Sequence, residues 1–179
     1  MSVLPLIYAP NEILKTKAEP VQAVNDDIRS LVDKMFNTIY MEQAVGMGAN
    51  MVGILKRIAV VDMQPKGTKM PFVFINPEIT WRSDEMQTFK EGSLCFPGIT
   101  ADITRPKAIK VSFQDYEGNK QELDADGFFA TVIQHECDYL DGKVFLDYLS
   151  KMKRDLLMAK MQKFMRQHPP HVHSASCKH

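Results

Sequence analysis

Residues 132–142, VIQHECDYLDG, hold the most informative pattern of the chain. The apolar spacing around them predicts a helix that begins near residues 124–126 and ends at Gly142. On this helix His135 and position 139 lie one turn apart on the same face. An H-E-x-x-H pattern uses that geometry to bind a metal through two imidazoles, with the Glu as general base. Because position 139 is Tyr, only half of the pattern is present, and a histidine buried beside Tyr139 is the alternative that the spacing alone favours.

Two glycine-containing segments precede this helix. Residues 91–99, EGSLCFPGI, predict a turn or bulge near Gly92, an extended piece and a second turn at Pro97-Gly98. Residues 45–62, VGMGANMVGILKRIAVVD, predict a glycine turn followed by a strand. A dinucleotide-binding loop would need the strand before its glycines and a helix after them, so this order argues against a phosphate site.

The remaining periodicities predict a mixture of short strands and three helices. In chain order they are a helix over 25–42, a strand over 56–63, extended pieces at 72–75 and 79–81 joined by a turn, a hairpin of 109–113 and 121–123, and a helix over 147–167. Helices that bracket strands favour an α+β fold, with mixed or antiparallel short sheets packed around a central helix carrying the HExxY segment, and a C-terminal helix. On that last helix we expect Leu149, Met152 and Leu156 to face inward.

The length of 179 residues suits one domain over residues 1–167, and the polar, proline-containing residues 168–179 are expected to be a disordered tail. Lys plus Arg and Asp plus Glu both number 22, so no net field points to nucleic acid. No apolar run is long enough for a signal peptide or a membrane span. Three cysteines without an export signal indicate free thiols and a cytoplasmic protein.

The three segments, in this order and spacing, resemble the signature motifs of peptide deformylases. That family has G-x-G-L-A-A-x-Q, then E-G-C-L-S, then Q-H-E-x-D-H-L-x-G. Flanking stretches are also similar, namely INPEI (75–79), RPKAIKV (105–111) and GKVFLDYLSKMKRD after the helix. The resemblance covers roughly residues 4 to 165, and no single motif carries it.

The resemblance implies a reaction and a metal. The family removes the formyl group from the N-terminal methionine of new proteins. Its metal, usually iron(II) and replaceable by nickel or zinc, is held by the Cys of the second motif and both His of the third. The Glu of the third motif moves the proton, while the Gln of the first motif and the backbone N–H of the Leu in the second stabilise the oxyanion.

Carried over residue by residue, the third and second motifs are incomplete. His135 matches the first His ligand and Glu136 the general base, as Gln134, Asp138 and Leu140 match their motif positions. Tyr139 stands where the second His ligand should be, and Ser93 stands where the Cys ligand should be. Leu94 matches the Leu whose backbone N–H is the oxyanion donor, a role that its side chain does not affect.

The first motif is shortened. GMGANMVG fits the family pattern only if about two residues are missing, and no Gln remains. Gly46 and Gly48 of this motif and Gly92 of the second are the expected substrate-binding positions. Cys95 occupies the place of the Ser in the second motif.

These replacements predict a degenerate metal site and lost or strongly reduced activity. Ser is a neutral hydroxyl and Tyr has a reference pKa of about 10, so neither replaces a thiolate or an imidazole well. We therefore expect no cofactor, or one divalent Fe, Ni or Zn ion if the protein is active. Cys95 would rescue the site only through a bulge or register slip, because two residues of strand span about 6.6 Å against a metal–sulfur bond of about 2.3 Å.

Two further functions stay open at this stage. One is an active metallohydrolase with an atypical site of Cys95, His135 and Tyr139. The other is a non-catalytic module that binds formyl-methionyl peptides or, through the Lys/Arg face of residues 151–166, the ribosome. No direct nucleic-acid contact and no membrane contact are expected.

Overall fold

The computed structural model describes residues 1–170 and combines two antiparallel sheets with three helices. The helices are α1 (Asp26–Met41), α2 (Gly127–Leu140) and α3 (Lys151–Gln167). The strands are β1 (Gly46–Gly48), β2 (Ile58–Asp62), β3 (Pro71–Arg82), β4 (Met86–Ser93), β5 (Phe96–Pro106), β6 (Ala108–Gln114) and β7 (Lys120–Asp126). Short 3-10 turns are η1 (Glu12–Lys15), η2 (Ala49–Val52), η3 (Pro65–Gly67) and η4 (Phe145–Tyr148). The predicted α+β class is confirmed.

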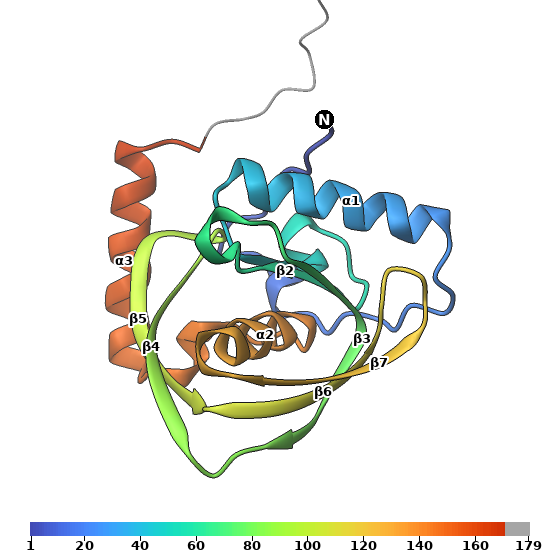
Figure 1. The fold of residues 1–179 in the computed structure, drawn as a ribbon. Helices are drawn as coiled ribbons and strands as arrows, with labels where there is room; N and C mark the ends of the chain where they lie inside the picture. Colours follow the sequence, from blue (N-terminus) through green and yellow to red (C-terminus); the bar gives the residue numbers. More distant parts are fainter. Residues whose placement is uncertain (171–179) are drawn as a thin grey trace, which may run out of the picture.

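The sheets enclose α2, the helix that carries the HExxY segment. Five strands pair in the order β1-β2-β3-β6-β7, and β4 pairs with β5 in a separate hairpin. Figure 1 shows α2 in the middle of the molecule, α1 across one end and α3 along the outside of the β4–β5 hairpin. This arrangement brings one face of α2 against β1 and the β4–β5 hairpin, which come from the first and second sequence motifs.

Helix α1 and the β6–β7 hairpin lie where the periodicities predict them. The side chain of Asn25 caps α1 by accepting a hydrogen bond from the backbone N–H of Ile28 at 3.0 Å. Val32 and Ile39 of its apolar stripe are fully buried. Within residues 1–170, no helix is long and apolar enough to cross a bilayer.

The predicted turns in the strand regions are partly wrong. Residues 72–75 and 79–81 belong to one strand, β3, because Asn76 takes a φ of +51° and creates a register shift instead of a turn. Its side-chain oxygen accepts a hydrogen bond from the backbone N–H of Val21 at 2.8 Å, and its side-chain NH2 group donates one to the Val21 carbonyl oxygen at 2.9 Å. These two bonds offset the strand hydrogen bonds that are lost at the register shift. The expected glycine turn at 46–48 is strand β1, since these residues pair with β2.

The β4–β5 hairpin contains the predicted bulge but not the second predicted turn. The register shifts between Glu91 and Ser93, beside Gly92, and the chain reverses at Leu94-Cys95. Gly98 lies inside β5 with a φ of +78°. A Cβ there would come within 2.3 Å of the Phe164 ring on α3, so the glycine permits close packing of helix on strand instead of a turn.

The inward face of α3 also differs from the prediction. Met152 and Leu156 are 74% and 65% exposed, whereas Met161 is fully buried and Leu157 packs against the core. The helix has Met and Leu on more than one face, so periodicity alone does not select the buried stripe. The predicted disordered tail covers residues 168–179, and positions 171–179 of it lie outside the residues that the structure describes.

Candidate active site

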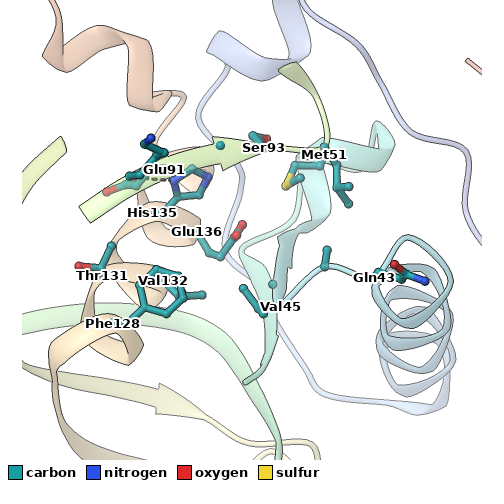
Figure 2. A pocket seen from close by; sticks show the side chains of 15 residues that line it. Gln43, Val45, Met51, Glu91, Ser93, Phe128, Thr131, Val132, His135 and Glu136 are labelled. Carbon is teal, nitrogen blue, oxygen red and sulfur yellow. Dashed lines mark hydrogen bonds and ion pairs between the residues drawn. The ribbon is translucent and has the colours of Figure 1, made fainter. Parts of the chain in front are cut away.

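Helix α2 presents His135 and Glu136 to a cavity of about 300 Å³. The other walls come from β1 and the segment before it, from Met51 of η2, and from residues 90–94 of the β4–β5 hairpin. Figure 2 shows Glu136 extending into this space and His135 turned toward Glu91. All three sequence motifs therefore meet at one site.

The His135 ring is fixed by a hydrogen bond on one side. Its Nδ1 lies 2.7 Å from Oε1 of Glu91, a residue on β4 that is 5% exposed. Burial opposes ionisation of Glu91, but the hydrogen bonds from His135 and Arg105 outweigh it and hold the pKa of this carboxyl below its ordinary value. An ionised Glu91 accepts the Nδ1–H, which leaves Nε2 as the free ring nitrogen.

Arg105 extends this bond into a buried network. Its guanidinium contacts Glu91 through Nε at 2.7 Å and through Nη2 at 2.9 Å, and Nη1 donates to Asp138 at 2.8 Å and to Tyr148 at 3.1 Å. The Tyr148 hydroxyl donates to the same Asp138 oxygen at 2.7 Å. Burial would lower the pKa of Arg105, but both carboxylates raise it. The network shares one cation between two carboxylates and orients His135 through Glu91.

Glu136 is less completely paired. It is 5% exposed, its Oε1 lies beside Gly46, and the backbone N–H of Gly48 donates to the carboxyl group. Its Oε2 is buried and has no hydrogen-bond partner within residues 1–170. The pKa of Glu136 is raised to about 7, chiefly by burial and also by the charge of Glu91, while His135 opposes the shift. The carboxyl is therefore available to a group that enters the cavity.

Ser93 and Tyr139, the two residues expected from the sequence at ligand positions, bind each other. The Ser93 hydroxyl and the Tyr139 hydroxyl form a hydrogen bond, and the backbone N–H of Cys95 donates to Ser93 Oγ at 3.2 Å. Tyr139 is fully buried, and burial raises the pKa of its phenol well above the ordinary value. Cys95 is also fully buried, and burial raises the pKa of its thiol to about 12.

Most of the residues singled out from the sequence lie at the cavity. Its walls include Gly46, Gly92, Ser93, Leu94, His135 and Glu136. Gly48, Cys95 and Tyr139 lie behind the wall, where a Cβ on Gly48 would stand 3.4 Å from Tyr139 Cβ. Sequence reasoning missed Met51, which lines the cavity. If the two residues that the first motif lacks are those after Gly48, Met51 falls at the position of the Gln in the family pattern.

Sequence reasoning also missed Glu91 and Arg105 as the partners that orient His135. Only their types could have indicated this, since a carboxylate and a guanidinium need polar partners wherever they are buried. Within residues 1–170, no group of three or more His, Cys, Asp and Glu side chains is arranged to hold a metal ion.

Comparison with known proteins assigns the family. The family model described as polypeptide deformylase matches residues 3–155. The chain belongs to the peptide deformylase family. A peptide deformylase-like protein of Rickettsia conorii is 62% identical over 174 residues, covering 97% of this chain and 95% of that protein. Peptide deformylase 1 of the same organism is 41% identical, covering 91% and 97%.

A solved member has the same fold as this chain. The crystal structure of peptide deformylase from Ehrlichia chaffeensis in complex with actinonin has a TM-score of 0.86 and 39% identity. The match covers 95% of this chain and all of the solved one. The two chains therefore share the peptide deformylase fold over nearly their whole lengths.

Proposed function

We propose that this member of the peptide deformylase family retains a peptide cleft but has lost, or strongly reduced, metal-dependent removal of formyl groups. One observation carries the proposal, the hydrogen bond between Ser93 and Tyr139. By the family motifs these are the positions of the Cys ligand and the second His ligand. In this chain the two side chains satisfy each other as neutral hydroxyl groups.

The chemistry of the donors does not fit iron, nickel or zinc. The pKa of Tyr139 is well above its ordinary value, so the phenol stays protonated near neutral pH. Ser93 offers a neutral oxygen in place of a soft thiolate. His135 remains the one good ligand, whereas a catalytic site of this kind uses about three protein ligands.

Two further replacements point the same way. A water that is not bound to a metal has a pKa far above the value of about 7 that a metal-bound water can have, so Glu136 has no acidic water to deprotonate. Met51 stands where the family has Gln, and its thioether accepts hydrogen bonds weakly and donates none. Loss of an oxyanion donor costs roughly 10²–10³ in rate in other enzymes.

The cleft itself is supported by the cavity and by the relatives. A cavity of about 300 Å³ lies beside Glu136, and the structurally similar Ehrlichia protein binds actinonin. In Rickettsia conorii a peptide deformylase-like protein stands beside a peptide deformylase 1, and this chain is closer to the first, at 62% against 41% identity. Such a pair would leave catalysis to one member and peptide recognition to the other.

An active site built on Cys95 is the competing function. The Cys95 thiol is fully buried, its pKa is about 12, and its Sγ lies 3.9 Å from the carbonyl oxygen of Met51. These features support a buried thiol in the core instead of a thiolate ligand.

The proposal is tested on protein purified without an affinity tag. Metal content and formate release from formyl-Met-Ala-Ser would be measured beside peptide deformylase 1 of Rickettsia conorii as the active control. We expect less than stoichiometric metal and formate release at least ~10³-fold slower than the control, from the combined loss of ligands and oxyanion donor. Stoichiometric metal with comparable turnover would contradict the proposal.

A further inference from the structure

Helix α3 has an outward face that no other part of residues 1–170 covers. The residues that define this face are all exposed, and they are Met152, Lys153, Leu156, Lys160, Lys163 and Arg166. Met152, Leu156 and Lys163 recur at the spacing that aligns side chains along one side of a helix, and the other three flank that line. The packed side of α3 lies against β5, where the Phe164 ring meets Gly98 and Met161 is fully buried. The outward face combines two apolar side chains with four cations and includes no carboxylate.

The helix concentrates positive charge in a chain that is neutral as a whole. Its 17 residues include six Lys or Arg and one Asp, so the remainder of the neutral chain carries five net negative charges. The one carboxylate, Asp155, binds Lys151 at 2.7 Å. The four cations of the outward face make no side-chain ion pair or hydrogen bond within residues 1–170. Their positive field is therefore directed at whatever approaches this face.

Two exposed apolar side chains distinguish the face from a plain cationic surface. Met152 and Leu156 are 74% and 65% exposed and lie one helical turn apart. The phosphates of a nucleic acid would bind the cations but gain little from these side chains, whereas the interface of an anionic bilayer accepts both kinds of group. Figure 1 shows α3 along the outside of the molecule, so a flat surface can approach the helix along its length.

We propose that the outward face of α3 docks this protein onto anionic membrane surfaces. The cations bind lipid phosphates, and the Met152 and Leu156 side chains enter the boundary between head groups and acyl chains. The negative remainder of the chain then faces away from the bilayer, which favours one orientation. The sequence predicts no membrane contact because no segment is long enough to span a bilayer, but a helix that lies on the surface needs no such segment.

Co-sedimentation of the full-length protein with lipid vesicles tests this docking. One set of vesicles is pure phosphatidylcholine, and in the other about a third of the lipid is phosphatidylglycerol. We expect at least ~10-fold tighter binding to the anionic vesicles, weakening as salt rises from about 0.05 M to about 0.5 M, because salt screens the four cations. A short RNA duplex at equal phosphate concentration serves as a competitor, and it should not displace the protein from the anionic vesicles.

Two pairs of lysine substitutions separate the local surface from the overall charge. Lys160→Gln with Lys163→Gln removes two cations of the outward face and should weaken binding to anionic vesicles at least ~10-fold. Lys110→Gln with Lys120→Gln, at exposed positions of β6 and β7, removes the same amount of charge and should change binding less than about 2-fold.

A third pair tests the apolar contribution that separates a bilayer from a nucleic acid. Met152→Gln with Leu156→Gln keeps every charge and a high helix propensity, and it should weaken binding to anionic vesicles at least ~5-fold. Equal binding to both vesicle types, binding to neither, displacement by RNA, equal effects of the two lysine pairs, or undiminished binding of this third variant would each overturn the proposal. None of the six residues lines the cavity beside Glu136, so the result is independent of the proposed function.

Discussion

The two sides of the His135 ring differ in how their polar groups are paired. On the Nδ1 side, Glu91, Arg105 and Asp138 form a buried network of charge-assisted bonds at 2.7 to 2.9 Å. Outside this network, Ser93 and Tyr139 bind each other as neutral hydroxyls, and the Tyr139 ring centroid lies 5.4 Å from that of His135. The network orients the imidazole through charged groups, whereas Ser93 and Tyr139 offer only neutral hydroxyl groups beside it.

This difference shows that orienting a ligand and holding a metal are separable. The network needs only the charges of Glu91, Arg105 and Asp138, all of which are present, so it persists whatever lies at Nε2. A metal at His135 would need two further donors of the right chemistry, and the hydroxyls of Ser93 and Tyr139 form a hydrogen bond with each other but are poor donors for iron, nickel or zinc. We therefore expect the network to determine stability and the Ser93–Tyr139 pair to determine metal affinity.

The largest expected effect comes from removing the cation of the network. Arg105→Met would leave Glu91 and Asp138 buried or half-buried without a counter-ion. Breaking such a pair from one side costs about 3–5 kcal/mol of unfolding free energy. Urea denaturation followed by circular dichroism would measure it.

The control for this change is the neighbouring exposed pair. Lys107 binds Glu85 at 3.1 Å, with 47% and 70% of the two side chains exposed. Lys107→Met should leave the urea midpoint unchanged within error, because solvent screens this pair. If both variants unfolded at the same urea concentration as the unmodified protein, the network would not be the stabilising side of the comparison.

A smaller effect is expected from rebuilding the ligand side. The double change Ser93→Cys with Tyr139→His restores both ligands beside an imidazole that Glu91 already orients. Zinc at 100 times its Kd should then stabilise the protein by about 2.7 kcal/mol. Denaturation with zinc and with a chelator would show the difference.

The unmodified protein and each single variant serve as controls for the rebuilt site. Each of them lacks at least one of the three ligands, so zinc should change its denaturation midpoint far less. Failure of the double variant to bind zinc would mean that the network does not hold His135 in a ligand-competent orientation. Deformylation is expected to stay low even in the zinc-bound double variant, because the thioether of Met51 on the cavity wall offers no hydrogen-bond donor to an oxyanion.

Much of the fold follows from the sequence where one local signal acts alone. Helix α1 has a cap at Asn25 and a single apolar stripe, and the structure agrees with both. The errors occur where tertiary contacts decide between local options. Asn76 bends a continuous strand because its side chain binds Val21, and Gly98 serves the packing of Phe164 instead of a turn.

The site, like the fold, can be predicted only in part from the sequence. The motifs identify which residues meet, since His135, Glu136 and Ser93 all line one cavity. They do not reveal that Ser93 and Tyr139 bind each other, because that depends on distances across the fold. The bond between Ser93 and Tyr139 joins positions 46 residues apart, and no local pattern encodes it.

The smallest expected effect tests whether the Cys95 thiol takes part in a metal site together with Ser93 and Tyr139. Burial raises the pKa of Cys95 and of Cys137 to about 12, so at pH 8 only ~10⁻⁴ of either thiol is thiolate. Alkylation by iodoacetamide, followed residue by residue by mass spectrometry, should therefore be slow for both in the folded protein and fast for both in urea. Cys137 is the control, because it lies on α2 away from the Ser93–Tyr139 pair. Fast alkylation of Cys95 beside a protected Cys137 would show an accessible thiolate next to Tyr139, and would favour the atypical metal site over the neutral pair.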